Sequence, residues 1–387
     1  MRPTTAPRTS GLLAGALTVT LLATACSGSD SRSPSTSPTS PASPTSSGTP
    51  TTPSPGSSAK PATWSRILRQ PVDGQHVVTQ QRKYLVTRAS DEAGTTTITE
   101  RAGGRTVVRH LPPAGFVAQS PVVIDDRWAL VEDIRSDGPN PEIRAYRYDL
   151  GTGRRTDLAS QQGLPRISEP EIGAYNGLFA YSSTDSRRRS CLVVAALDTL
   201  KASTVSCVAD PGYVADPVVS ADSVTFSEIT APQTAQRCKR LLTASLSGGP
   251  AREIPASRKC LQWSGASLRG ATVWSEVGAA DPDQYQSSAY LRESPDAAAR
   301  SLGRVVTDTI IACGNWIHWE VRAVKNGAET YQLHRWQPGQ PRPQIVYAGP
   351  PDTAITAPAC QDDQVIIEAA HLGAGTKYTE ALALPAT

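Results

Sequence analysis

The segment Asp216–Glu228, DPVVSADSVTFSE, determines how the rest of the chain is interpreted. An apolar run leads to a short polar turn and an alternating run then returns, which is the pattern of a β-hairpin. The same plan occurs earlier, in SPVVIDDRWALVED from Ser120 and EPEIGAYNGLFAYSS from Glu169. Looser copies follow in SGASLRGATVWSE from Ser264, IACGNWIHWE from Ile311 and APACQDDQVIIEA from Ala357. The chain therefore contains an internal repeat.

The copies recur with a nearly constant period. The spacings between the ends of successive second runs are 50, 46, 48, 44 and 48 residues, measured at Glu132, Ser182, Glu228, Glu276, Glu320 and Glu368. A second hairpin follows the first in each copy, as in IRAYRYDLGTGRRTDL, where Gly151 and Gly153 supply the turn. Two hairpins make four strands, and this number of strands at this period predicts one blade of a β-propeller.

Seven blades are expected. A shortened copy, HVVTQQRKYLVTR with TTTITERAGGRTVVRHL, precedes the first clear one, and the last copy ends with only a third strand, TKYTEALALP. The segment TWSRILRQ before the first blade can supply the missing strand, and this pairing would remove the open sheet edges. We therefore predict an all-β, seven-bladed propeller over residues 62–387, closed by an N-terminal strand. Two unrelated β-sandwich domains are the alternative, but they would not explain a single period.

The repeat resembles the WD-like β-propeller repeats of TolB-type proteins. In that family a Pro opens the inner strand, a Ser-Pro-Asp-Gly-like turn follows, and an aliphatic-aromatic run closes the second strand. Here Pro121, Pro170, Pro217 and Pro358 hold the opening position. The turn departs from the family form in every copy, and SADS from Ser220 is the nearest. The resemblance implies a binding platform, and it does not specify a partner.

The N-terminus has the features of a lipoprotein leader. The apolar stretch Gly11–Leu22 follows Arg2 and Arg8, and it is too short for a membrane-spanning helix, which needs about 20 apolar residues. It ends in LATAC, with Cys26 last, which resembles the bacterial lipobox. Residues 1–25 are therefore expected to be a lipoprotein signal peptide, and Cys26 to be diacylated and inserted in the lipid bilayer. An ordinary secretory leader is the alternative.

The next segment is expected to be a tether. Between Ser27 and Lys60, 13 Ser, 6 Thr and 7 Pro make up 26 of 34 residues, and such a composition cannot build a core. Residues 26–61 thus form a predicted lipidated, disordered tether, and the propeller is expected outside the cytoplasm, anchored at the cell surface.

The six other cysteines are predicted to form disulfides, since an exported chain meets an oxidising compartment. Cys191 and Cys207 lie equally far from the turn near Thr199, and Cys238 and Cys260 straddle Gly248-Gly249. Each pair is expected to face its partner across an outer hairpin. Cys313 and Cys360, at matching positions of consecutive blades, remain to form the third pair. No CxxC or close Cys/His group is present, which argues against a metal site built from them.

No catalytic motif stands out. The strings GxSxG, HExxH, GxGxxG and the P-loop are absent, and the five His residues are scattered, at His76, His110, His318, His334 and His371. The formal net charge of +3 falls to about +1 without the leader, so nucleic acid is not an expected partner. The sequence predicts a binding or scaffold module for an envelope protein or glycan, without a cofactor. The alternative is a propeller enzyme of the lyase or glycosidase type that acts on an extracellular polysaccharide or metabolite.

A repeated acid marks a candidate ligand face. Five of the six clear copies have a glutamate at one equivalent position, at Glu132, Glu228, Glu276, Glu320 and Glu368. This position ends the second strand, on the face that carries the loops into the inner strands, where Asp216 and Glu169 would add charge. A ring of carboxylates there could hold a cation or a basic partner. The alternative is structural, with each carboxylate accepting hydrogen bonds from backbone N–H groups or an Arg of the next blade.

Two other features have a structural and a functional interpretation. Trp263, Trp274, Trp316, Trp319 and Trp336 all lie in the last four blades, where they are expected to pack between blades in preference to stacking on sugars. The run Arg187–Arg189 falls after a second strand, and a solvated loop is expected there in preference to a site for an anionic polymer.

Overall fold

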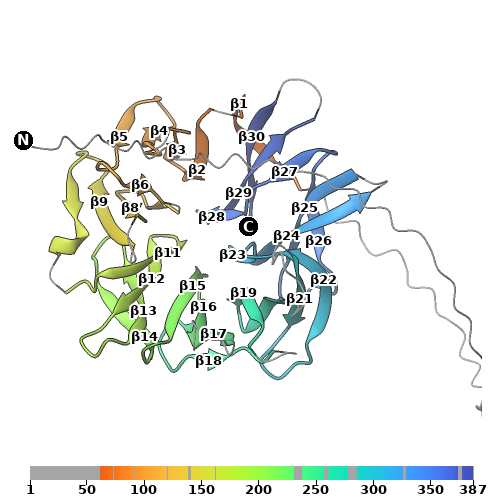
Figure 1. Cartoon of the computed structure of the whole chain (residues 1–387). Helices are drawn as coiled ribbons and strands as arrows, with labels where there is room; N and C mark the ends of the chain where they lie inside the picture. Colours follow the sequence, from red (N-terminus) through yellow and green to blue (C-terminus); the bar gives the residue numbers. More distant parts are fainter. Residues whose placement is uncertain are drawn as a thin grey trace, which may run out of the picture. The chain divides into compact units, whose positions relative to one another are not determined.

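The structure is a computed structural model that describes residues 62–386 except 73, 92, 120, 138–140, 162, 231–237, 257–259, 278–285, 326–327 and 374–376. The predicted signal peptide, Cys26 and the tether lie outside the described residues. Seven antiparallel sheets surround one axis, as Figure 1 shows in a view along it. The predicted seven-bladed propeller is therefore confirmed.

The first four blades follow the chain in order from the centre outward. Blade 1 contains β2 (His76–Gln80), β3 (Tyr84–Arg88), β4 (Thr96–Glu100) and β5 (Thr106–His110). Blade 2 contains β6 (Val117–Ala118) and β7 (Val123–Ile124), which both pair with β8 (Trp128–Arg135), then β9 (Glu142–Asp149) and β10 (Arg155–Asp157), and a short 3-10 helix (Leu158–Ser160) follows. Blade 3 contains β11 (Ile167–Tyr175), β12 (Leu178–Thr184), β13 (Ser190–Ala196) and β14 (Ala202–Val208). Blade 4 contains β15 (Tyr213–Val219), β16 (Ser223–Thr230), β17 (Cys238–Ser245) and β18 (Arg252–Glu253).

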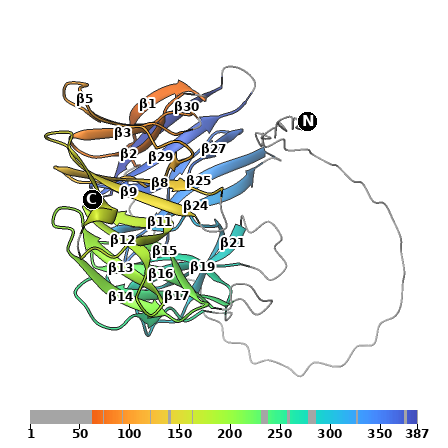
Figure 2. The ribbon, with the colours of Figure 1, turned by 60° about the vertical axis from the view of Figure 1, so that its left-hand side comes forward.

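The last three blades repeat this order, and Figure 2 shows the same sheets obliquely. Blade 5 contains β19 (Gln262–Leu268), β20 (Ala271–Glu276), β21 (Gln286–Arg292) and β22 (Arg300–Val306). Blade 6 contains β23 (Ile311–Cys313), β24 (Trp316–Lys325), β25 (Ala328–Trp336) and β26 (Gln344–Ala348). Blade 7 contains β27 (Thr353–Ile355), β28 (Ala359–Gln361), β29 (Gln364–His371) and β30 (Tyr378–Pro385), and its outermost strand is β1 (Ser65–Pro71).

The ring closes as the sequence predicts. Strand β1 pairs antiparallel with β30, from Ser65 opposite Ala383 to Pro71 opposite Tyr378. Just before β1, the indole Nε1 of Trp64 donates a hydrogen bond of 2.6 Å to the carbonyl of Val346 in blade 6. The first described segment therefore completes the last sheet and also contacts its neighbour. Because all seven sheets and the closing strand lie within residues 65–385, the propeller is complete without the N-terminal region.

The core consists of one apolar cluster at each of the seven blade interfaces. Trp319 and Trp336 of blade 6 pack against blade 5, Trp274 of blade 5 packs against blade 4, and Trp316 faces blade 7. These four side chains are buried, which confirms the packing interpretation. Trp263 is only half-buried.

Hairpin turns join the first and second strands of each blade, and we call the end of the propeller that they form the turn face. Asn176-Gly177, Arg269-Gly270 and Asp362-Asp363 all have positive φ at both residues, which is the type I′ geometry that Asn, Asp and Gly favour. Turns of neighbouring blades also bind each other. Asp222 accepts a hydrogen bond of 2.9 Å from the backbone N–H of Arg269. We call the opposite end, where the inner strands begin, the loop face.

Proline distorts the start of the inner strands, because it cannot donate to the sheet. Near Pro170 the register of β11 shifts between Ile167 and Ile172, and near Pro217 that of β15 shifts between Ala215 and Val218. Blade 5 has the same irregularity between Gln262 and Gly265 without a proline. The inner strands thus begin with β-bulges, which re-aim side chains at the loop face.

All three predicted cysteine pairs form disulfides. Cys191 lies directly opposite Cys207 across β13 and β14, and Cys313 on β23 bonds Cys360 on β28, which joins the inner strands of blades 6 and 7. The position expected for the Cys238–Cys260 pair is wrong. Strand β18 ends at Glu253, so Cys260 lies beyond the outer hairpin, on the segment that enters blade 5.

No helix in the described part of the chain is long and apolar enough to cross a membrane.

Candidate functional site

The five equivalent glutamates are inside the propeller and do not form an exposed ring. They occupy the second strands β8, β16, β20, β24 and β29, but only Glu276 ends its strand as predicted, and the others lie within theirs. Each is buried: Glu132, Glu228, Glu276, Glu320 and Glu368. The expected ring of carboxylates open to a ligand is therefore not formed by these five glutamates. Strand alternation directs these side chains toward a neighbouring blade, whose side chains cover them.

Three of these carboxylates have hydrogen-bond partners, but only Glu368 has the kind that the structural interpretation predicts, a backbone N–H group of the next blade. Glu368 accepts hydrogen bonds from the backbone N–H of Val77, at 2.9 Å, and from Nδ1 of His76, at 3.0 Å, both in blade 1. Glu228 accepts one of 2.7 Å from Nη2 of Arg240 on the adjacent strand. Glu276 accepts one of 2.9 Å from the indole of Trp274.

The other two glutamates have raised pKa values. Burial, together with the neighbouring Asp133, raises the pKa of Glu132 to about 8, and its Oε1 has no hydrogen-bond partner among the described residues. Burial raises the pKa of Glu320 to about 8. Both side chains are therefore protonated in the folded protein at neutral pH, and neither is accessible to a ligand.

A different group of charged side chains lies on the loop face, beside the mouth of the central channel. Lys239 is buried and forms an ion pair of 2.6 Å with Asp216 Oδ2. The same oxygen accepts a hydrogen bond of 2.9 Å from the hydroxyl of Ser227. Glu171 accepts one of 2.9 Å from the backbone N–H of Asp216. Blades 3 and 4 are thus joined by two carboxylates and one ammonium.

Blades 5 and 6 complete this group. The Lys239 ammonium lies 4.1 Å from the centre of the Trp263 ring, and the Trp263 indole donates a hydrogen bond of 2.8 Å to Asp308 Oδ2. We call Glu171, Asp216, Lys239, Trp263 and Asp308 the mouth cluster. Its members come from four consecutive blades.

Bulged strands position three members of this cluster. Glu171, Asp216 and Trp263 each lie within the irregular start of an inner strand, and Asp216 has a φ of 50°. The close approach of the inner strands depends on Gly173, where a Cβ atom would lie 2.1 Å from the carbonyl oxygen of Pro217. A regular strand at these places would direct the side chains elsewhere.

The cluster has an excess of negative charge. Desolvation by the surrounding protein, followed by repulsion from Asp216, raises the pKa of Glu171 to about 7, although the residue keeps contact with solvent. The surrounding protein also raises the pKa of Asp308 and of the nearby Glu169, although Asp308 keeps contact with solvent. Lys239 is the cation that acts on both Glu171 and Asp308. Three carboxyl groups of the cluster thus share one ammonium, and the site can accept a cation or donate a proton.

Below the cluster, the channel forms a cavity of about 410 Å³. It is lined by the inner strands and largely by apolar residues, including Val122, Ile172, Val218 and Ile311, and Asp308 lies at its rim. A volume of this size falls within the range of about 300–1,000 Å³ typical of small-molecule sites.

The sequence predicted only part of this site. It pointed to Asp216 and Glu169, and it missed Glu171, Lys239, Trp263 and Asp308 as a group. Lys239 lies on a third strand, and Glu171 and Trp263 lie at different distances from their hairpin turns. Trp263 and Asp308 share a position but not a residue type, so the repeat does not mark this group. The EPE string at Glu169–Glu171 beside a strand-opening proline was the available signal.

A buried triad between blades 1 and 2 is structural. His110 shares hydrogen bonds of 2.8 Å with Asp133 and 2.7 Å with the hydroxyl of Tyr148. The side chains of His110 and Asp133 have no exposed surface. A nucleophile or base that no substrate can reach performs no catalysis, so the arrangement holds the two blades together.

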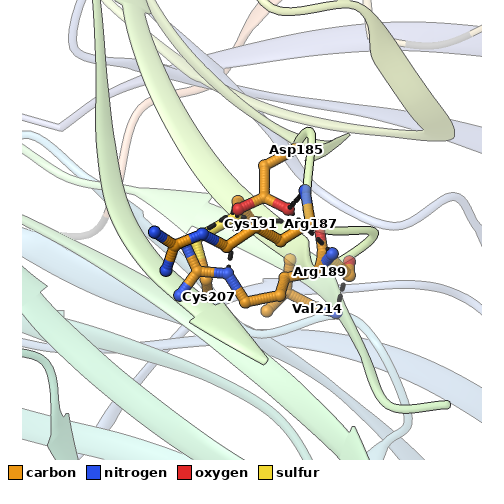
Figure 3. The surroundings of a disulfide bond; sticks show 7 residues. Asp185, Arg187, Arg189, Cys191, Cys207 and Val214 are labelled. Carbon is orange, nitrogen blue, oxygen red and sulfur yellow. Dashed lines mark hydrogen bonds and ion pairs between the residues drawn. A yellow bond between two sulfur atoms is a disulfide. The ribbon is translucent and has the colours of Figure 1, made fainter. Parts of the chain in front are cut away.

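The Cys191–Cys207 disulfide lies beside a carboxylate, as Figure 3 shows. Asp185 and the two sulfurs come within 4.8 Å of one another, but disulfide sulfurs are not thiolates and do not bind metal ions. Asp185 instead accepts hydrogen bonds from Nε of Arg189, at 2.8 Å, and the backbone N–H of Arg187, at 2.9 Å. This carboxylate therefore orders the loop, and Arg187 and Arg188 are exposed to solvent, as expected for a solvated loop.

Known proteins resemble this chain in fold only. No protein-family model matches the chain, and no curated relative is found. Among solved structures, a polysaccharide lyase, Uly1, is 10% identical, with 82% of this chain and 90% of that chain covered and a TM-score of 0.48. TolB from Acinetobacter baumannii is 8% identical, with 81% and 80% covered and a TM-score of 0.37.

A third similar structure is an acylaminoacyl peptidase, 12% identical, with a TM-score of 0.43. The match covers 65% of this chain and 42% of that one, so this chain corresponds to less than half of that enzyme. TolB-like and enzymatic propellers are thus both among the structures that resemble this chain.

Proposed function

We propose that the protein is a lipid-anchored, extracytoplasmic binding module that takes up a component of the cell envelope at the channel mouth. The mouth cluster carries this proposal. It is a group of charged and aromatic side chains from four blades beside the opening of the channel. Glu171 and Asp308 are exposed to solvent, and the three carboxyl groups exceed the one ammonium. The lipobox-like LATAC string and the tether composition support the anchor, and three disulfides suit an oxidising compartment.

We propose that the partner is either a protein or a glycan of the cell envelope. A glycan usually stacks on an open aromatic face. Lys239 already lies over the Trp263 ring, and the other tryptophans of the last four blades are buried. These observations favour a protein partner over a glycan.

Affinity capture tests the proposal. The propeller from Ala59 onward, which forms one compact unit, is used as bait in a cell-envelope extract. The matched bait carries Asp216→Asn with Lys239→Met, which removes both members of the ion pair together. We expect the partner to be lost from this bait and retained by an Asp198→Asn bait, changed on the turn face. Equal capture by all three baits would contradict the proposal.

An enzyme is the second candidate, favoured by one observation. A carboxyl group whose pKa lies near 7, as for Glu171 beside Asp216, suits general acid or base catalysis. Polysaccharides containing uronic acid can be incubated with the propeller while the ultraviolet absorbance of an unsaturated product is followed. Product formation that disappears in Glu171→Gln would support a lyase, and its absence leaves binding as the function.

A further inference from the structure

The channel beneath the mouth is the cavity that the proposed function leaves unused. Its wall is mostly apolar and comes from the inner strands of blades 1–4, 6 and 7, with Val78, Ile172 and Ala357 among the lining residues. A cavity of about 410 Å³ with such a wall favours an aliphatic ligand, because burial of apolar surface is the main source of affinity there.

Hydrogen bonds cross the far end of this channel. On the turn-face side, the amide of Gln361 in blade 7 donates a bond of 2.7 Å to the carbonyl of Ile124 in blade 2. The hydroxyl of Tyr175 in blade 3 donates one of 2.6 Å to Asp363 in blade 7. These bonds join blades that are not neighbours. A ligand therefore enters from the loop face, and the end that enters last stays at the mouth.

The charge at the mouth determines which chemical group the ligand carries at the end that stays there. Asp308 lines the cavity, and Glu171 and Asp216 directly precede the lining residues Ile172 and Pro217. Lys239 is already paired with Asp216. A carboxylate or phosphate headgroup would meet this acidic rim and be repelled. An ammonium group would neutralise part of it.

We infer that the channel binds a single-chain amphiphile, with its aliphatic chain inside the ring of inner strands and a cationic headgroup among the mouth carboxylates. The ligand class is thus a small lipid-like amine, which goes beyond the macromolecular partner proposed above. This inference rests on the proposed function in one respect: both place binding at the mouth cluster.

Titration calorimetry with hexyl-, octyl- and decylammonium chloride, below their micelle concentrations, tests this inference on the propeller from Ala59 onward. We expect the Kd to fall about fourfold for each added methylene, since one buried CH₂ contributes about 0.8 kcal/mol. Octanoate, with a similar chain and the opposite charge, should bind at least tenfold more weakly than octylammonium.

Variants test the acidic mouth and the apolar channel separately. Asp308→Asn should weaken octylammonium binding about tenfold, whereas Asp296→Asn, an exposed acid on blade 5, should leave it unchanged. Ala357→Trp, at an exposed position of the channel wall, should abolish the dependence on chain length. Thermal unfolding of each variant verifies that it is folded.

Several results would overturn the inference: no binding of any alkylammonium, equal binding of octanoate, or chain-length dependence that survives Ala357→Trp. A lysine-containing peptide that binds in place of the alkylammonium ions would assign the mouth to a protein side chain. In each case capture of an envelope partner through the mouth cluster could still occur, so the two proposals fail separately.

Discussion

At the scale of single residues, one repeated glutamate meets different surroundings in different blades. Glu368 contacts a backbone N–H of the next blade, Glu228 an arginine of its own sheet, and Glu276 a tryptophan of its own strand. One oxygen of Glu132 has no hydrogen-bond partner in the part of the chain that the structure describes. Strand alternation determines the direction in which these side chains point, and the residues around each one determine which hydrogen bonds it accepts.

Replacement of Glu132 by Gln should make stability less dependent on pH. The folded pKa of about 8 is above the ordinary value of 4.5, so the contribution of this carboxyl is fully present below pH 4.5 and is lost as pH rises toward 8. We expect Glu132→Gln to be more stable than the natural protein at pH 8, by about 1–3 kcal/mol, and similar to it at pH 5. Urea unfolding at the two pH values measures this. An equal decrease with pH in both proteins would show that Glu132 is ionised when folded.

Replacement of Glu368 should destabilise the propeller, because this buried carboxylate accepts hydrogen bonds across the seam between blades 7 and 1. Glu368→Ala leaves the N–H of Val77 without its acceptor, and we expect a loss of about 2–3 kcal/mol in the free energy of unfolding. Glu368→Gln keeps an oxygen for this N–H and should cost less. Chemical unfolding at pH 7 gives both values, and equal costs would mean that the acceptor is not what matters.

At the scale of elements, the strands and their turns follow from local chemistry. Asn176-Gly177 and Asp362-Asp363 have the positive φ values that their residue types favour, and prolines mark the irregular start of inner strands β11 and β15. The position of Cys260 could not be predicted in this way. Its symmetry about Gly248-Gly249 suggested a long outer strand, whereas β18 contains only Arg252 and Glu253.

Removal of β1 tests the closure of the ring. A chain that begins at Val72 lacks Trp64 and the six residues of β1 that pair with β30, and its blade 7 exposes an open edge. We expect it to lose about 3 kcal/mol or more of stability and to aggregate at lower temperature than a chain that begins at Ala62. Calorimetry and light scattering measure this comparison. Equal melting temperatures would show that β1 does not hold the ring closed.

At the scale of the whole molecule, the sequence could predict the propeller but not its mouth. One period through the chain gives the number of blades, and the incomplete last copy gives the closing strand. The repeat did not reveal the mouth cluster, because Lys239 lies on a third strand, Trp263 in a bulge and Asp308 before a first strand. Only the ring brings these positions together, and a repeat compares equivalent positions alone.

Replacement of the predicted lipidated cysteine tests where the molecule resides. Cys26→Ser removes the thiol that would be acylated, so we expect the protein to move from the membrane fraction to the medium and to lose incorporation of labelled palmitate. A variant with Ser27→Ala serves as the matched control. Membrane association of Cys26→Ser equal to that of the control would contradict the lipid anchor.

The most direct test of the account asks which face of the propeller meets the partner in the intact cell envelope. A photo-reactive amino acid is placed at one of four exposed positions, Ala357 or Arg187 on the loop face and Thr199 or Ser247 on the turn face, and the cross-linked products are identified by mass spectrometry. Binding at the channel mouth predicts one recurrent product from the loop-face positions, strongest at Ala357, and none from the turn face. A partner cross-linked from Thr199 or Ser247 and absent at Ala357 would contradict it.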